Sequence, residues 1–364
     1  MANTSYGVND AEAVKLWSRK TMHEALKMTY ASRFIGTGSD SLCQIKDDTA
    51  KSAGDRIRCI LRMQLTGRGI QGDDTLEGNE EALVTYTDDI LINQLRHAVR
   101  SGGKMSEQRV PFEVREEARM GLQDWWSGTF DQWFMNQLCG AAAVTDTRLT
   151  GNQAALSPDS THIIYAGSAT AESNLSANSS QTFSLEVIDR AVLAARTLTP
   201  VIRPLNNQQE PGKHQFVMFI TPEQHFDLRR GTSTGEWQDI QKYALSADSS
   251  DKNPILSGAI GMYNGCILHE SFRLYTFANA DGAADGAGRA VLCGAQAAGL
   301  AFGRDYSATR MKWTEELFDF GNQLGVATGI IGGLKKFRYN NRDFGTLVVS
   351  TAHSTAARAA SQRS

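Results

Sequence analysis

Residues 111–139 read PFEVREEARMGLQDWWSGTFDQWFMNQLC, and this stretch determines how the rest of the chain must be organised. Large apolar residues recur every fourth position, and a second tryptophan adds a three-residue step. They are Leu122, Trp126, Phe130, Trp133, Phe134 and Leu138. This spacing places a broad apolar stripe along one face of a helix. At 1.5 Å per residue the helix would be about 40 Å long, so it needs a large surface to pack against.

The sequence also marks both ends of this helix. Pro111 suits the first helical turn, where its missing N–H costs nothing, and Gly140 suits a left-handed cap. The helix dipole favours acidic residues in the opening turns, and three are present there: Glu113, Glu116 and Glu117. Inside the helix, Gly121 and Gly128 each weaken it by about 1 kcal/mol relative to alanine. We predict a long core helix. The alternative, an aromatic box for a cofactor, has no supporting motif nearby.

Composition indicates a soluble globular protein without a strong field for nucleic acid or membrane. The chain has 364 residues, 41% hydrophobic and 21% charged, with a net charge of −3. That length fits two ordinary domains or one large one. No apolar run approaches the roughly 20 residues of a membrane helix, and the N-terminus does not resemble a secretion signal. The five scattered cysteines indicate neither a disulfide framework nor a zinc site.

Two extended segments precede the long helix. Residues 57–65 alternate apolar and polar side chains, and residues 83–92 are rich in strand-favouring residues. Between them lies a glycine-rich, acidic stretch, 66–82. An isolated two-stranded arm is marginal in water. We therefore expect it to need a partner surface, either in its own chain or in a neighbouring one.

The remaining pattern mixes helices and strands, so the fold class is α+β. We expect helices at 10–34, 184–198, from Pro222 onward and at 237–245. We expect strands at 216–220, 262–268, 273–277, 315–319, 325–337 and 346–351, and at 290–302 a strand that runs into a close-packed segment. Segments 36–56 and 141–182 are expected to be loops, and the last dozen residues a loose tail.

No catalytic constellation is present, so we expect no enzyme, cofactor or metal site. Gly67–Gly72 matches GxGxxG, but acids follow it where a dinucleotide would need a helix N-terminus. Asp-Phe-Gly occurs at 319–321 and 343–345 without the other kinase motifs, and both copies are better explained as strand–turn junctions. The histidines are scattered, with no ligand spacing.

One basic stretch is interleaved with aromatic residues. It contains Lys335, Lys336 and Arg338 beside Phe337 and Tyr339. Such a stretch could touch a phosphate backbone. A solvated strand face is the more ordinary interpretation.

Several long strings resemble a family of tailed-bacteriophage major capsid proteins, over about residues 4–352. They are Arg62–Leu83 (RMQLTGRGIQGDDTLEGNEEAL), Gln94–Ala118 (QLRHAVRSGGKMSEQRVPFEVREEA), Tyr263–Ser271 (YNGCILHES), Leu292–Gly303 (LCGAQAAGLAFG) and Asn322–Asn340 (NQLGVATGIIGGLKKFRYN). The resemblance implies the fold shared by tailed-phage, herpesvirus and encapsulin shell proteins. Its expected parts are an N-terminal arm (1–56), an extended two-stranded loop (57–104), a peripheral domain (105–215) with spine helix 111–139, an axial domain (216–312), return strands of the peripheral domain (313–352) and a tail (353–364).

The implied function is structural: self-assembly into hexamers and pentamers of an icosahedral shell enclosing double-stranded DNA. Partners would be other copies of the chain, packaged DNA bound without sequence specificity and, in addition, scaffolding, portal and decoration proteins, with no membrane. The protein would reside in the virion after assembly in the host cytoplasm. An encapsulin-like compartment is the alternative, and a dinucleotide-binding enzyme is a third.

If the chain forms such a shell, the candidate site residues are charged residues on its surface. We expect the loop acids to pair with basic residues of an adjacent subunit and to fix register. The inter-subunit candidates are Arg68, Asp73, Asp74, Glu77, Glu80, Glu81, Arg100, Lys104 and Arg109. Lys335, Lys336 and Arg338 are the candidates for contact with DNA on the inner face.

Overall fold

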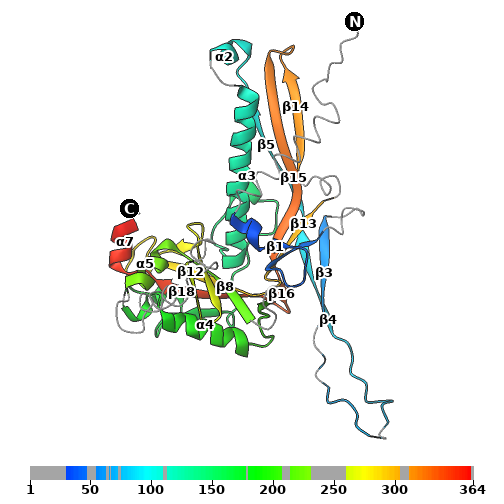
Figure 1. The fold of residues 1–364 in the computed structure, drawn as a ribbon, viewed down its shortest axis with the longest axis vertical. Coiled ribbons are helices and arrows are strands. Elements are labelled where there is room, and N and C mark those ends of the chain that lie inside the picture. Colours follow the sequence, from blue (N-terminus) through cyan, green and yellow to red (C-terminus); the bar gives the residue numbers. More distant parts are fainter. Residues whose placement is uncertain are drawn as a thin grey trace, which may run out of the picture.

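The structure is a computed structural model of the chain. It describes residues 30–46, 55–62, 65, 67–72, 75–109, 113–177, 179–206, 214–230, 260–303 and 311–361. The described part is elongated, with a long helix and a hairpin at one end, a rounded domain to the side and a thin loop projecting at the other end (Figure 1).

The predicted long helix is α3, Val114–Cys139, with 26 residues. All six residues of its predicted stripe are buried, which confirms the stripe. Gly140 ends the helix in the left-handed conformation (φ 61°, ψ 42°), and its N–H donates to the Gln137 carbonyl at 3.3 Å. The predicted C-terminal cap is therefore confirmed, while Pro111 lies outside the described residues.

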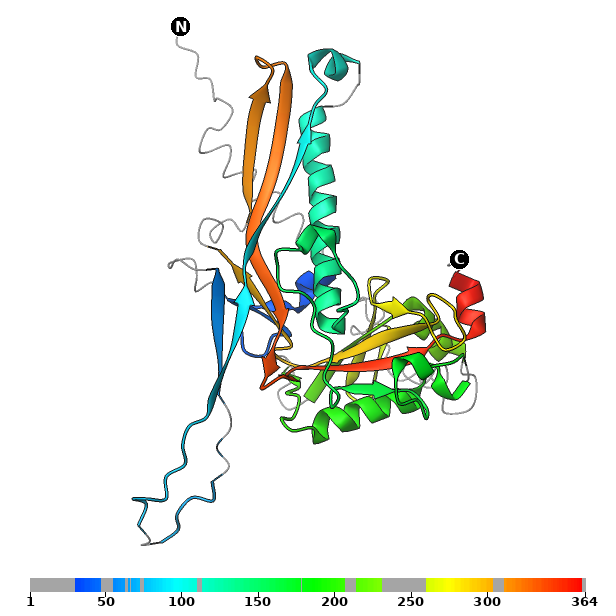
Figure 2. The same cartoon turned by 180° about the vertical axis from the view of Figure 1, so that it is seen from behind.

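The N-terminal half of α3 lies along one sheet, called the peripheral sheet here, whose strand order is β1-β2-β13-β15-β14, with β5 also paired to β15. Trp126 donates its indole N–H to Oγ1 of Thr328 on β15 at 2.6 Å, which ties the helix to the sheet. Figure 2 shows the helix running parallel to the long β14–β15 hairpin. The strands are β1 (Ile35–Gly36), β2 (Cys43–Lys46), β5 (Asn93–Arg100), β13 (Ala298–Phe302), β14 (Lys312–Phe318) and β15 (Gln323–Lys336).

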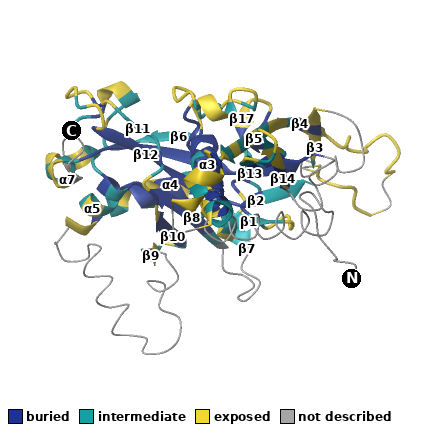
Figure 3. Ribbon diagram, turned by 90° about the horizontal axis from the view of Figure 1, so that it is seen from above, coloured by how far each residue is buried: buried dark blue, intermediate teal, exposed yellow. Residues whose placement is uncertain are grey.

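A second sheet, called the axial sheet here, has the order β6-β18-β12-β8-β10-β9, with β11 beside β12 and β7 beside β8. On β8, Val217 and Phe219 face the core around α3, whereas Phe216 and Met218 face the core around α4. Both faces are thus covered, which explains the continuous apolar run at 216–220. In Figure 3, β12 appears as a buried strand, in agreement with its burial pattern, and every residue of β18 is buried as well.

The axial strands are β6 (Ile163–Tyr165), β7 (Leu205–Asn206), β8 (His214–Ile220), β9 (Gly261–Tyr263), β10 (Cys266–Glu270), β11 (Thr276–Phe277), β12 (Ala287–Cys293) and β18 (Thr346–Ala352). The helices around this sheet are α4 (Leu185–Thr197), α5 (Pro222–Arg230) and α7 (Thr355–Ser361). Short 3-10 helices are η1 (Tyr30–Phe34), η3 (Thr147–Leu149), η4 (Glu172–Asn174) and η5 (Ser179–Gln181).

The projecting loop starts from the antiparallel pair β3 (Arg56–Arg62) and β4 (Thr85–Leu91). Its base packs on its own chain, because Ile57 and Ile90 share a buried cluster with Phe337. The predicted two-stranded arm is therefore present, and its base finds a partner surface within the subunit. A small β16 (Arg338–Tyr339) and β17 (Arg342–Asp343) hairpin follows β15.

Several sequence expectations need correction. The predicted loop 36–56 contains β2, which pairs in parallel with β13. The predicted strand 262–268 is a tight hairpin, because Asn264 and Gly265 adopt positive φ between β9 and β10. The predicted tail forms α7, since the Ser354 hydroxyl accepts the Ala357 N–H at 3.0 Å and Ala357 is buried. Expected helix 237–245 and most of expected helix 10–34 lie outside the described residues.

The expected domain boundaries stay a prediction, and the sheet topology groups the elements as follows. Strand β18, expected to return to the peripheral domain, pairs with β12 in the axial sheet. Helix α4, expected in the peripheral domain, packs against the same axial sheet. The expected strand 290–302 divides into β12 and β13, which belong to different sheets. The chain thus crosses between the sheets at residues 294–297.

Candidate assembly surfaces

The part of the loop beyond β3 and β4, residues 65–84, is called the tip here. Every residue of the tip that the structure describes is exposed. Three of them are large apolar residues with more than half of their surface exposed: Leu65 (56%), Leu76 (61%) and Leu83 (59%). Exposed apolar residues grouped on a projecting segment indicate a surface that another molecule covers.

Backbone contacts of two acids give the tip its local shape. Glu81 accepts the Gly67 N–H at 2.6 Å and links the two sides of the tip. Glu80 accepts the Gly78 N–H at 2.9 Å and holds a turn. Arg68 and Glu77 are exposed on the same segment. Asp73 and Asp74 lie outside the described residues.

The basic candidates Arg100, Lys104 and Arg109 lie at the opposite end of the molecule, around α2 (Lys104–Gln108) (Figure 1). The guanidinium of Arg100 stacks over the Phe318 ring, 4.3 Å from its centre. The backbone N–H of Lys104 donates to Oδ1 of Asn322 at 3.3 Å. The tip cannot reach this end of its own subunit, so the predicted pairing remains a prediction about neighbouring copies.

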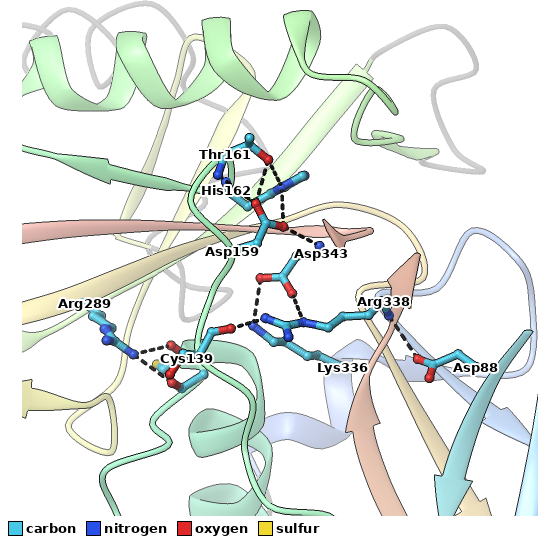
Figure 4. A network of polar contacts seen from close by, with 11 residues as sticks. Asp88, Cys139, Asp159, Thr161, His162, Arg289, Lys336, Arg338 and Asp343 are labelled. Atoms are coloured by element: carbon cyan, nitrogen blue, oxygen red, sulfur yellow. Dashed lines mark hydrogen bonds and ion pairs between the residues drawn. The ribbon is translucent and has the colours of Figure 1, made fainter. Parts of the chain in front are cut away.

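The basic stretch 335–338 lies inside the subunit, and this corrects the expectation of DNA contact. Lys336 is completely buried, and its Nζ lies 2.8 Å from Oδ2 of Asp343 (Figure 4). Arg338 donates through Nε to the other Asp343 oxygen at 2.7 Å. Lys335 pairs with the buried Asp88. Each cation is neutralised within the chain, and Lys336 has no surface to offer to a phosphate.

These contacts form a junction network that joins the loop to both sheets. Asp88 on β4 accepts from Lys335 and from the Arg338 N–H, at 3.0 Å for the latter. Asp343, which holds Lys336 and Arg338, lies on β17 just before axial strand β18. Burial lowers the pKa of Lys336, and the Asp343 carboxylate opposes that shift.

Asp159 extends the network towards the long segment after α3. It accepts the Asp343 N–H at 2.7 Å and the Thr161 hydroxyl at 2.6 Å, and it lies 2.9 Å from Nδ1 of His162. Burial alone would raise the pKa of Asp159, but these hydrogen bonds together hold it well below its ordinary value.

Arg289 on β12 fastens the end of α3 to the axial sheet. Its Nη1 donates to the carbonyls of Cys139 and Gly140 at 3.0 and 2.8 Å, where the helix leaves carbonyls without helical partners. Its other nitrogens bond Glu172 at 2.6 and 2.8 Å. The side-chain hydrogen bond and charge of Glu172 outweigh burial and raise the pKa of Arg289.

Sequence reasoning missed the acids of the junction network. One signal was available for Asp88, because it shares a strand face with Tyr86 and the buried Ile90. An acid on the inward face of a strand requires a buried cation. Arg289 gave no such signal, since its partner Glu172 comes from a distant part of the chain. The cations that pair with Asp343 are close in sequence, but only the turn between β16 and β17 brings them together.

The geometry gives no support to a nucleotide site at Gly67–Gly72. The described residues between Gly72 and β4 form no helix, so no helix N-terminus faces a phosphate there. Within the described ranges, no group of His, Cys, Asp or Glu is suited to hold a metal ion. None of the described helices is long and apolar enough to cross a membrane.

Comparisons with known proteins find relatives over nearly the whole chain. Residues 4–355 match the family model described as "Phage capsid protein". The chain is 27% identical to the "Major capsid protein" of Pseudomonas phage KPP25, over 94% of this chain and 95% of the relative.

Solved structures agree with these matches. The capsid of Ralstonia phage GP4 has a TM-score of 0.77 and 34% identity, covering 97% of this chain and 99% of that one. The cyanophage Pam1 capsid has a TM-score of 0.71 at 19% identity, covering 98% and 95%, and therefore supports the fold alone.

Proposed function

Since the chain belongs to the phage capsid protein family, we propose that it is the major subunit of an icosahedral shell of hexamers and pentamers around double-stranded DNA. The relatives described above are phage capsid proteins, so the encapsulin-like alternative is not favoured. The chain resembles capsid proteins over nearly its whole length, and their role is structural. We therefore keep the expectation that the protein is not an enzyme.

The single observation that carries the assembly mechanism is the exposed tip. Its described residues present apolar side chains and acids to solvent, while the base of the loop packs on the body of the subunit. A neighbouring subunit would cover this surface and gain the free energy of burying it. Because each subunit has several neighbours, many modest contacts add up to a stable shell.

The charges on the tip and at the α2 end suit pairing between copies. The acids Glu77, Asp73 and Asp74 belong to the tip, whereas Arg100, Lys104 and Arg109 lie at the far end. Opposite charges at opposite ends cannot neutralise each other within a subunit. Across an interface they contribute mainly register and specificity.

The proposed relation to DNA is loose enclosure. The net charge is −3, and the basic stretch 335–338 is neutralised by buried acids. A shell of such subunits would hold DNA without tight binding, and any contact would be local and salt-sensitive. Scaffolding, portal and decoration proteins are further proposed partners, and the virion is the proposed location.

Charge reversal at the tip tests the proposal. Glu77→Lys, or Asp73→Lys with Asp74→Lys, should abolish shells seen by negative-stain electron microscopy while circular dichroism of the subunit stays unchanged. Glu186→Lys on α4 is the matched control, because Glu186 is exposed and the charge change is the same as for Glu77→Lys. Normal shells from both tip variants would refute the role of the tip acids.

A further inference from the structure

The first Asp-Phe-Gly motif forms the end of the β14–β15 hairpin, at the extremity of the molecule (Figure 1). Its Phe320 is fully exposed, at 110% of the reference surface. The second motif behaves differently, because Phe344 packs against the buried cluster at the base of the loop. The same three residue types thus place one phenylalanine inside the subunit and one entirely outside it.

The backbone at Phe320 is unusual for a bulky residue. Asp319, Phe320 and Gly321 have φ of 53°, 52° and 84°, all in the left-handed region. The Gly321 N–H donates to the Phe318 carbonyl at 3.2 Å, so Asp319 and Phe320 are the central residues of a tight turn. Such turns favour Asn-Gly, and a phenylalanine there is strained. Turn chemistry therefore does not account for Phe320.

Contacts beneath the turn hold it in place. Asn322 donates through Nδ2 to Oδ2 of Asp319 at 3.1 Å and accepts the Lys104 N–H at 3.3 Å. Ser101 accepts the Leu324 N–H at 3.1 Å through its hydroxyl. The segment between β5 and α2 thus braces the hairpin from the side. Phe320 projects from a fixed support and loses little conformational freedom when it is covered.

We propose that Phe320 is an anchor between subunits, which packs into an apolar surface of a second copy of this chain. Leu317, half exposed near the end of β14, adds apolar surface at this end of the hairpin. Arg100, Lys104 and Asp319 are exposed at the same end of the molecule, so charged side chains accompany the apolar ones, as in protein interfaces with an apolar centre and a polar rim. Rigid aromatic anchors of this kind carry a large share of interface energy.

The second copy is the favoured occupant because a shell is built from repeats of one chain, so this inference rests on the proposed function. Strain at an exposed residue is retained where function uses the residue. A residue that served only the fold of the subunit would be replaced here by glycine or asparagine without loss.

Phe320→Gly tests the anchor, with Phe320→Tyr as the control that keeps the ring. Glycine removes the strain, so the subunit should melt at the same or a higher temperature. The lowest concentration at which shells form should nevertheless rise by about tenfold, as expected for losing an interface anchor. Shell formation by Phe320→Gly at the wild-type concentration would overturn the inference, even if a decoration or scaffolding protein no longer bound.

A second experiment measures burial of the hairpin end directly, in shells assembled above the raised concentration that loss of the ring requires. All five native cysteines are buried, so a single Phe320→Cys substitution supplies one reactive thiol at the hairpin end. Labelling with a maleimide should be fast in the free subunit and at least about tenfold slower in shells. Equal labelling in both would overturn the inference. Failure of the wild-type chain to assemble would instead count against the proposed function itself.

Discussion

Nζ of Lys336 lies 2.8 Å from Oδ2 of Asp343, and both side chains are completely buried. The second oxygen of Asp343 accepts from Arg338 at 2.7 Å, so one carboxylate serves two cations. The three residues lie where β15 leaves the peripheral sheet and the chain turns towards β18 of the axial sheet. The pair therefore fixes the junction between the two sheets.

Removing Asp343 should destabilise the subunit more than removing Lys336. Asp343→Leu leaves two cations without their carboxylate, whereas Lys336→Met leaves Asp343 paired with Arg338. Breaking a buried pair typically costs about 3–5 kcal/mol, and we expect Asp343→Leu at the upper end of that range. Urea denaturation of the unassembled subunit measures both. Equal stability of Asp343→Leu and wild type would show that the pair does not hold the junction.

The hydrogen bond between Trp126 and Thr328 should contribute measurably to the packing of α3 on β15. Thr328→Val keeps the shape but leaves the buried indole N–H without its acceptor. We expect a loss of about 1–3 kcal/mol in the free energy of unfolding. Thr328→Ser keeps the hydroxyl and should lose less. The hydrogen bond has no such role if valine proves as stable as serine at this position.

The acid dependence of stability should change when Asp159 is replaced. Its folded pKa lies below the unfolded value, so the carboxylate stabilises the folded state above about pH 4, and this contribution is lost as pH falls through the folded pKa. Asp159→Asn should therefore be less stable than wild type at pH 7, with the gap narrowing in strong acid. Denaturation curves from pH 7 to pH 2 measure this gap. A gap that is constant or widens towards acid would contradict the assignment.

Two glycines should respond oppositely to alanine. A Cβ at Gly121 meets nothing within 4 Å, so Gly121→Ala should stabilise α3 by about 1 kcal/mol. A Cβ at Gly333 would lie 2.1 Å from the Leu91 carbonyl oxygen, so Gly333→Ala should destabilise the contact between β15 and the loop base. Thermal unfolding of both variants compares them. The packing described here would be wrong if Gly333→Ala left the melting temperature unchanged.

Sequence periodicity predicted the elements whose buried side chains form a strong, regular pattern in the sequence. The stripe on α3, the alternation in β3 and the apolar run of β8 each identify one element and its buried face. Prediction failed where a short contact from elsewhere in the chain decides the structure. β2 forms because β13 offers an edge, and α7 because Asp227 accepts the Ser354 N–H at 2.9 Å. No local pattern encodes such partners.

The sequence likewise predicted some of the candidate surfaces and not others. The exposed loop followed from its poor capacity to bury residues by itself, and the tip conforms to that expectation. The basic stretch at 335–338 was misleading because Asp88 and Asp343, which neutralise it, approach through the fold. The sequence could not distinguish Phe320, because Phe344 lies in an identical Asp-Phe-Gly motif at 343–345 and packs inside the subunit.

Electron microscopy of the purified chain, after a sedimentation run, tests the central claim most directly. We expect closed shells, tubes or hexamer-sized rings. In closed shells, the density of residues 65–84 should lie against a neighbouring subunit. A single small species that never assembles at any salt or crowding, even with a scaffolding protein present, would contradict the account.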